Sequence, residues 1–341
     1  MVVFLLHKST CSFNFSYLRF YVGTISSCSS YRKSKHKKKN IVIDSHQKNQ
    51  KGHHGRNSSY LYGRSLCQIS MEASKRPITR VLLKSTWELS PPDDKRINSI
   101  CTIAEKKGIS VEFKPVSHLY NISDGRPHQG VCLEVGNRSV FPMNPELLNK
   151  LINMENTSSP LFWVLLYDIH DPVNVGSILR TCSFLGVTNV MMTSRCAPLT
   201  AVACKASGGA TELVNLYTVG NSMEFIKALM KLGWDILGSG TNADSYEVDD
   251  DADKLRESNH KSIDIPGNLL PPMCDITAVK ITKPSLLVLG NEGSGISIAV
   301  LNTCSKVINV NPSPRCTTPS SVSCLNVSTA AAIILHRLLN H

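Results

Sequence analysis

The sequence lacks the C-x-x-C and His-rich ligand pairs that mark a zinc site, although it contains 12 cysteines. The closest cysteines, such as Cys196 and Cys204, are eight residues apart. Structural zinc sites take their ligands from more closely spaced pairs, so we expect no metal. Cysteines scattered in this way are typical of reduced thiols that pack as small apolar side chains.

Long apolar runs are also missing. A helix that crosses a bilayer needs roughly 20 consecutive apolar residues. No stretch of this sequence approaches that length. We therefore expect no membrane-spanning segment.

Acidic residues are absent from the first 43 positions, and residues 1–56 carry eleven Lys and Arg against one acid, Asp44. The other 285 residues carry 26 basic and 25 acidic groups, so the net charge of +11 belongs almost wholly to the N-terminal segment. Such a composition is typical of a transit peptide. We expect residues 1–56 to be a basic, disordered tail that directs the chain to the mitochondrial matrix. A nuclear-directing tail, based on the lysines at 37–39, is the alternative.

The rest of the chain is long enough for two domains. Residues 60–136 alternate helical and strand patterns, which predicts a small α/β domain. The expected elements are a helix after Gly63, strands at 78–83, 110–113 and 130–135, and a helix at 95–107. Residues 137–159 are polar and interrupted by proline, which favours a linker with one short helix at 145–154.

From residue 160 onward, apolar strands alternate with helical stretches. The expected strands are 161–167, 189–192, 213–219, 234–237, 286–289 and 307–310. Runs of Val, Leu and Ile in this rhythm predict a mainly parallel sheet covered on both faces, with ligands at the carboxyl ends of its strands. Residues 241–272 break the rhythm with several acids, which indicates an exposed insertion; a metal or partner site there is the alternative.

The first segment with side chains suited to chemistry follows the strand at 161–167. Asp171 can cap a helix there, Asn174 and Gly176 lie in its opening turn, and Arg180 follows on the same face. This places an amide, a bare backbone and a cation at a strand-to-helix turn. By itself, an ordinary capped helix with a surface arginine explains the stretch equally well.

The second segment is a buried strand that runs into a glycine-rich turn containing Gly290, Gly293 and Gly295. No GK[ST] follows and the pattern is not GxGxxG, so it is neither a Walker loop nor a dinucleotide turn. The carboxylate of Glu292 suits a cationic or hydroxyl-bearing ligand better than a phosphate. A plain tight turn is the alternative.

The third segment begins the last helix, which Asn326 can cap. Small residues from Ser328 to Ala332 let this helix pack closely against a neighbour. Either a core or a dimer interface would use such a face.

Together and in this order, the three segments resemble the signature motifs of the SpoU (TrmH) family of RNA ribose methyltransferases in the SPOUT superfamily. The motif patterns are N-x-G-x-x-x-R, L-x-L-G-x-E-G-x-G and S-L-N-x-S-x-A, and the resemblance covers residues 161–339. Tyr62, Gly63 and residues 128–131 also resemble the substrate-binding domain of the ribosomal RNA subgroup. Within that subgroup the mitochondrial large-subunit enzymes are the most similar.

The resemblance implies an α/β fold in which a trefoil-knotted methyltransferase domain with a mainly parallel sheet (160–341) follows a small α/β, ribosomal-protein-like substrate-binding domain (60–136). It implies S-adenosylmethionine as cofactor, ribosomal RNA as partner, and a homodimer through the last helix. The implied reaction is 2′-O-methylation of a ribose, that of a guanosine, in mitochondrial large-subunit ribosomal RNA.

The resemblance also implies roles for individual residues. Those around the reacting ribose are Arg180, Glu292 and Asn326, with Asn174 in support. Those at the cofactor are Gly290, Asn291, Gly293, Gly295, Ile308, Val310 and Leu325. Because a guanidinium stays protonated, we expect Arg180 to hold phosphate and to stabilise the forming alkoxide, not to accept the proton.

Two positions leave other interpretations open. Cys324 stands where the family has Ser, and a thiol is a weaker hydrogen-bond donor. A catalytically weak RNA-binding assembly factor is therefore one alternative, although Arg180 and Glu292 favour an enzyme; a transfer RNA ribose methyltransferase is the other. His128 either contacts RNA or is satisfied by local hydrogen bonds, and it is not among the expected catalytic residues.

Overall fold

The computed structural model describes residues 59–154, 159–240, 271–313 and 324–340. All of them lie within one compact unit, His53–His341. The predicted transit segment and nearly all of the predicted acidic insertion lie outside the described residues.

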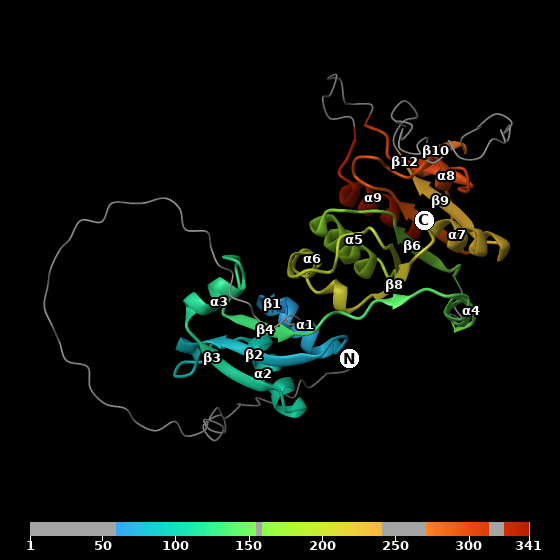
Figure 1. The fold of residues 1–341 in the computed structure, drawn as a ribbon. Coiled ribbons are helices and arrows are strands. Elements are labelled where there is room, and N and C mark those ends of the chain that lie inside the picture. The colour runs from blue at the N-terminus through green and yellow to red at the C-terminus, as the bar shows by residue number, and fades with distance from the viewer. Residues whose placement is uncertain (1–58, 155–158, 241–270, 314–323, 341) are drawn as a thin grey trace, which may run out of the picture. The chain divides into compact units, whose positions relative to one another are not determined.

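The N-terminal part is built on a four-stranded sheet in the order β1-β4-β2-β3, blue to green in Figure 1. The strands are β1 (Ser59–Tyr62), β2 (Ile78–Lys84), β3 (Ser110–Lys114) and β4 (Val131–Val135). β2 and β3 are parallel, and the other neighbours are antiparallel. The helices are α1 (Arg64–Ala73), α2 (Lys95–Lys107) and α3 (Val116–Ile122). The elements predicted for this part are therefore confirmed.

α2 shows how local sequence sets the bounds of a helix. Asp94 accepts hydrogen bonds from the backbone N–H groups of Arg96 and Ile97, and so caps the first turn. Gly108 ends the helix in the left-handed conformation at φ 64°, which costs glycine little. Between these ends, apolar residues at helical spacing turn one face of α2 into the core of the N-terminal part.

The C-terminal part contains an eight-stranded sheet in the order β10-β12-β9-β11-β6-β7-β8-β5, in which every pair is parallel. Its strands are β5 (Phe141–Pro142), β6 (Phe162–Leu166), β7 (Asn189–Thr193), β8 (Asn215–Val219), β9 (Asp235–Ser239), β10 (Met273–Asp275), β11 (Ser285–Leu289) and β12 (Lys306–Asn309). The helices are α4 (Pro145–Met154), α5 (Pro172–Phe184), α6 (Ala201–Ala206), α7 (Ser222–Lys231), α8 (Ile298–Leu301) and α9 (Val327–Leu339).

Alternate residues of β6 enter two different cores. Trp163 packs with Ile226 of α7, whereas Val164 packs with Ile178 of α5 and Leu335 of α9. Figure 1 shows α5 and α7 on opposite sides of β6. Since side chains point alternately to the two faces of a strand, the sheet is covered on both faces, as predicted.

The predicted strands of this part are all present, with ends shifted by at most two residues. Shifts of two residues occur at the end of β9 and at the start of β8, where Leu213 follows a 3₁₀ helix (Ala210–Glu212) and is 55% exposed. β5 lies inside the predicted linker and pairs with β8, and β10 pairs with β12. Both were missed because strands this short show no period of their own.

β6 is the strand at which the direction of the connections reverses. From β6 the chain continues to β7 and then β8 on one side of β6. It then crosses to the other side, where it forms β9 and later β11, which pairs between β9 and β6. In open α/β sheets, ligands bind outside the carboxyl ends of the strands at such a switch point. The ends of β6 and β11 are therefore the expected place for a site. The trefoil knot is not established by this strand order and stays a prediction.

Within the described ranges, no helix is both long and apolar enough to span a membrane.

Candidate functional site at the ends of β6 and β11

The first two sequence motifs meet at the switch point. Asp171 accepts a hydrogen bond from the backbone N–H of Val173 and begins α5 just after β6. Asn174, in the first turn, donates from Nδ2 to Oε1 of Glu292 at 2.7 Å. Glu292 lies in the turn after β11 and is exposed. An amide from one motif thus orients the carboxylate of the other.

The glycine-rich turn is held shut by its own hydrogen bonds. Asn291 and Gly295 exchange backbone hydrogen bonds of 3.0 and 3.1 Å, and Oδ1 of Asn291 accepts from the backbone N–H groups of Gly293 and Ser294. A Cβ on Gly290 would stand 2.6 Å from the carbonyl carbon of Gly295, so this closure requires glycine. The outer edge of the turn, at Glu292 and Gly293, is exposed.

A turn after β6 anchors the same loop. Asn291 donates from Nδ2 to the carbonyl oxygen of Asp168 at 2.6 Å. Asp168 has φ 56°, a left-handed conformation that is uncommon outside glycine. Its backbone N–H donates to Thr193 Oγ1, and this hydroxyl donates to the Asp168 carboxylate at 2.6 Å. Arg195 pairs with the same carboxylate.

Gly176 serves a purpose that differs from the predicted one. The sequence pointed to a bare backbone at the site, but Gly176 is buried where α6 crosses α5. A Cβ there would stand 2.8 Å from Cβ of Ala206 and 3.0 Å from the backbone nitrogen of Ser207. The glycine of the first motif therefore permits close packing of two helices.

Arg180 is exposed on α5. Its guanidinium carbon lies 3.7 Å from the position of a Cβ on Gly208, just after α6. Among the described residues, no hydrogen bond or ion pair joins Arg180 to Glu292, Asn174 or Asn326. The structure thus joins Asn174 to Glu292, which lies beside Asn291 in the same turn, and leaves the Arg180 side chain outside this contact.

The third motif begins α9 as predicted. Asn326 caps the helix by accepting from the backbone N–H and the hydroxyl of Ser328, at 2.9 and 2.7 Å. This occupies its oxygen and leaves the amide Nδ2 to donate elsewhere. Leu325 is 43% exposed, and Cys324 is also exposed.

The two apolar candidates near β12 differ in accessibility. The Ile308 side chain is fully buried in the core, and its backbone oxygen accepts from the N–H of Gly240 at 3.0 Å. Val310 is partly buried against the same core. The side chain of Ile308 is therefore not accessible to a ligand.

His128 forms a local hydrogen bond, which is one of the two interpretations that the sequence left open. Its Nδ1 accepts from the backbone N–H of Gly130 at 3.1 Å. Burial lowers the pKa of His128, and the nearby Lys84 lowers it further. The imidazole is therefore favoured in its neutral form.

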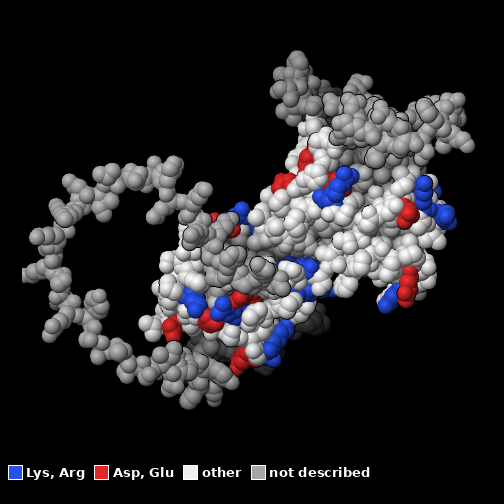
Figure 2. Space-filling view, in the orientation of Figure 1, with Lys and Arg blue, Asp and Glu red and all other residues white. Residues whose placement is uncertain are grey.

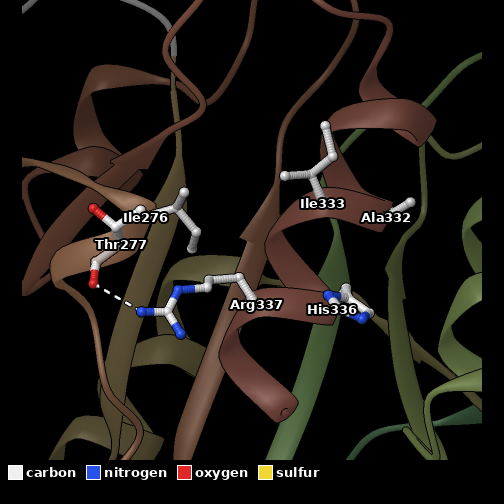
Figure 3. Close-up of a pocket in the computed structure, with 6 residues that line it drawn as sticks. All are labelled: Ile276, Thr277, Ala332, Ile333, His336 and Arg337. Carbon is white, nitrogen blue, oxygen red and sulfur yellow. Dashed lines mark hydrogen bonds between the residues drawn. The ribbon is translucent and has the colours of Figure 1, made fainter. Parts of the chain in front are cut away.

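A shallow cavity of about 500 Å³ lies between α9, the helix that the third motif begins, and the short 3₁₀ helix Ile276–Ala278. It is lined by Ile276, Thr277, Ala332, Ile333, His336 and Arg337. Figure 3 shows Arg337 reaching from α9 to the carbonyl oxygen of Thr277, with which it forms a hydrogen bond of 3.1 Å.

Charge on the face shown in Figure 2 is mixed, with Lys and Arg interspersed among Asp and Glu. Among the residues with described positions, no group of three or more His, Cys, Asp or Glu could hold a metal ion.

Comparison with known proteins identifies the family. Residues 161–336 match the SpoU rRNA Methylase family, and residues 60–139 match the RNA 2′-O ribose methyltransferase substrate binding family. The human protein named rRNA methyltransferase 1, mitochondrial, is 30% identical over 280 residues, which cover 82% of this chain and 71% of the human protein. The chain belongs to the SpoU rRNA methylase family. The resemblance carried by the three motifs is confirmed.

Other members of the SpoU family agree with this assignment. The 23S rRNA (guanosine-2′-O-)-methyltransferase RlmB of Photobacterium profundum is 28% identical over 256 residues, covering 75% of this chain and 88% of that protein. The crystal structure of the SpoU methyltransferase AviRb from Streptomyces viridochromogenes, in complex with the cofactor AdoMet, superposes with a TM-score of 0.57. That match has 18% identity and covers 83% of this chain and 89% of AviRb, so it bears on the fold.

The sequence motifs of this SpoU family member did not predict the anchoring turn at Asp168 or its partner Thr193. An Asp just after a buried strand is a weak signal of a turn. Nothing in the sequence pairs it with a threonine 25 residues later.

Proposed function

We propose that this chain transfers a methyl group from S-adenosylmethionine to the 2′-oxygen of a ribose, that of a guanosine, in the large-subunit ribosomal RNA of mitochondria. The observation that carries this proposal is the hydrogen bond between Asn174 and Glu292, which joins two motifs at the switch point of a parallel sheet. Family membership and the names of the relatives support the reaction and the substrate.

The loop after β11 fits adenosylmethionine in two respects. Its outer edge is exposed at Gly293, so the backbone of the turn is open to a ligand that lies against it. Leu325, which is 43% exposed, offers an apolar contact. We assign the cofactor to Gly290, Asn291, Gly293, Gly295, Val310, Leu325 and the backbone of Ile308. The sulfonium compound supplies an electrophilic methyl group when it is bound.

The side chains around the ribose have separate tasks. Glu292, oriented by Asn174, accepts a hydrogen bond from the ribose hydroxyl, and the free Nδ2 of Asn326 donates to the sugar. Arg180 is exposed and binds the adjacent phosphate. Its guanidinium also stabilises the negative charge that develops on the 2′-oxygen as the hydroxyl proton passes to the carboxylate of Glu292. Asn174 is a positioning residue. The chain mainly aligns the two reactants, which lowers the entropic part of the barrier.

We propose that the protein forms a homodimer through the exposed face of α9. We also propose that it is located in the mitochondrial matrix. Ile333, which is 40% exposed, lines the shallow cavity beside α9, and the small residues before it permit close approach of a second copy. Sedimentation equilibrium of the chain and of Ile333→Asp tests this assignment. A wild-type monomer at micromolar concentration would contradict it.

The test of function is methyl transfer from labelled adenosylmethionine to a transcript of mitochondrial large-subunit ribosomal RNA, with mapping of the 2′-O-methylated positions. Arg180→Ala should lower the rate by about 10²–10³-fold, as expected for loss of one group that stabilises developing negative charge. Arg96→Ala, which changes an exposed arginine on α2, is the matched control.

Three outcomes separate the alternatives. Label at one ribose of the ribosomal transcript, lost in Arg180→Ala and kept in Arg96→Ala, supports the proposal. Methyl transfer only to transfer RNA would instead identify the chain as a transfer RNA ribose methyltransferase. RNA binding without transfer, unchanged by either substitution, would favour the assembly factor, which the exposed Cys324 at the family's serine position motivates.

A further inference from the structure

Two lysines lie over buried aromatic rings, and an arginine binds the hydroxyl of one of these rings. Lys84, at the end of β2, stands 4.9 Å from the centre of the Trp87 ring, and Lys205 of α6 stands 5.7 Å from that of Tyr62. Arg126 donates from Nη1 to the Tyr62 hydroxyl at 3.4 Å. We call Lys84, Arg126 and Lys205 the basic rim. Its members come from three segments that are far apart in the sequence.

The aromatic rings support the cations and are not available to stack on a base. Trp87 is 6% exposed and Tyr62 is 3% exposed. Arg64 also lies 5.5 Å from the centre of the Trp87 ring. A base needs an open ring face for stacking, whereas a buried ring with a cation above it holds that cation in place. The rim therefore offers fixed positive charge without a stacking platform.

The charges of the rim are not neutralised within the described part of the chain. None of Lys84, Arg126 and Lys205 forms an ion pair with a described carboxylate. Arg64, by contrast, pairs with Asp94 at 2.7 Å, and its charge is balanced. Because the chain beyond residue 56 is nearly neutral, this local excess of three positive charges is the kind of feature that binds a polyanion.

The rim is continuous with the proposed catalytic residues through α6. Lys205 lies three residues before Gly208, beside which the Arg180 guanidinium stands. On the other side, Lys205 reaches Gly63 and Tyr62 of the N-terminal part. Lys205 and Arg126 share Tyr62, so a chain of phosphates that begins at Arg180 meets Lys205 and then Arg126. Lys84 adjoins them through Trp87, whose ring lies beside Gly130.

We propose that the basic rim of Lys84, Arg126 and Lys205 binds the phosphate backbone of the RNA that leads to the target ribose, and that it does so without reading bases. This inference rests on the proposed function, since it takes RNA as the substrate. Lysines held over buried rings, and an arginine held by a tyrosine hydroxyl, fit phosphates at any sequence. The rim thus contributes affinity and direction, while the choice of nucleotide is made elsewhere.

The test measures the affinity of the full chain for two RNAs of equal length, the large-subunit transcript and an unrelated sequence, over a range of salt concentrations. Lys84→Gln, Arg126→Gln and Lys205→Gln should each weaken binding of both RNAs several-fold. Each should also reduce the slope of log K against log salt by about 0.7–0.9, the value for one lost phosphate contact. Lys205→Arg should retain most of the affinity, because it keeps the charge.

Lys231→Gln is the matched control, because Lys231 is an exposed lysine at the end of α7. Thermal melting of each variant identifies loss of folding, and Lys205→Arg separates loss of charge from loss of packing. An unchanged slope in all three rim variants would overturn the proposal. A loss confined to the large-subunit transcript would also overturn it, since that result requires base reading.

Failure of the rim and failure of the proposed function give different results. If the chain transfers methyl groups but its RNA affinity does not depend on the rim, the result contradicts phosphate binding by the rim and supports the proposed function. If RNA binding shows the expected salt slopes but no methyl group is transferred, the result supports phosphate binding by the rim and contradicts the proposed function.

Discussion

Consecutive residues of α6 face two charged clusters that differ in exposure. Cys204 lies 3.5 Å from Nη2 of Arg76, which forms an ion pair of 2.5 Å with Glu212, and the side chains of this pair are 2% and 0% exposed. Lys205, the next residue, belongs to the basic rim, in which Lys84 and Lys205 are half-buried and Arg126 is exposed. The first cluster is buried and its opposite charges are paired, whereas the second is partly exposed and carries only positive charge.

The buried cluster joins segments that the chain sequence separates widely. Arg76 precedes β2, whereas Glu212 ends a 3₁₀ helix 136 residues later. Arg138, after β4, donates to the backbone oxygen of Thr211 at 3.0 Å and lies 3.9 Å from Glu212. Charges buried in this way must be paired, whereas exposed charges remain available to a partner. The two clusters therefore differ in whether their positive charges are balanced: those of Arg76 and Arg138 face Glu212, whereas those of the rim face no described carboxylate.

The largest expected effect comes from breaking the buried cluster. Glu212→Gln keeps the shape of the side chain but leaves Arg76 and Arg138 without an anion, so the free energy of unfolding should fall by about 3–5 kcal/mol. Denaturant titration measures this change. The control is Glu112→Gln. Glu112 forms an ion pair with Arg80, and the side chains of this pair are 32% and 36% exposed, so the free energy of unfolding should fall by only about 0–1 kcal/mol. Equal losses of stability in the two variants would show that the buried ion pair contributes no more than the exposed one.

A smaller effect is expected where α6 rests on α5. Gly176→Ala places a Cβ 2.8 Å from Cβ of Ala206, and overpacking of this kind costs about 1–3 kcal/mol. Alanine gains about 0.5–1 kcal/mol over glycine inside a helix, so the net effect is a loss of stability. RNA affinity should also fall, because α6 carries Lys205.

The control for this prediction is Gly220→Ala, where an added Cβ meets nothing within 4 Å. Its free energy of unfolding and its RNA affinity should match the wild type. If Gly176→Ala is as stable as that control, then close packing is not what the first motif requires of its glycine.

The smallest effect concerns the pH dependence beside the rim. The pKa of His128 is lowered by burial and by Lys84, so the folded state disfavours the imidazolium. The stability that this provides is present above the ordinary histidine pKa of about 6.5 and is lost as the pH falls toward the lowered pKa. Between pH 7.5 and 5, His128→Gln should lose less stability than the wild type. A steeper loss in the variant would mean that the folded state favours the charged form.

Most of the elements could be predicted from the sequence. The strands of the large sheet are continuous apolar runs, and α2 lies between Asp94 and Gly108, so that local sequence sets their bounds. Asn174 and Glu292 could be selected because their motifs follow strands whose carboxyl ends meet at a switch point. β5 and β10 could not be predicted, because two or three residues pair only when a neighbouring strand is already in place.

Most of the strand and helix pattern, the three motifs and the family follow from local sequence, because each depends on residues close together in the chain. Three contacts follow only from three-dimensional packing: Gly176 against α6, the turn at Asp168 with Thr193, and Lys205 over the ring of Tyr62. These contacts join residues far apart in sequence. Their geometry is set by packing of whole helices and strands, which no local pattern of residues encodes.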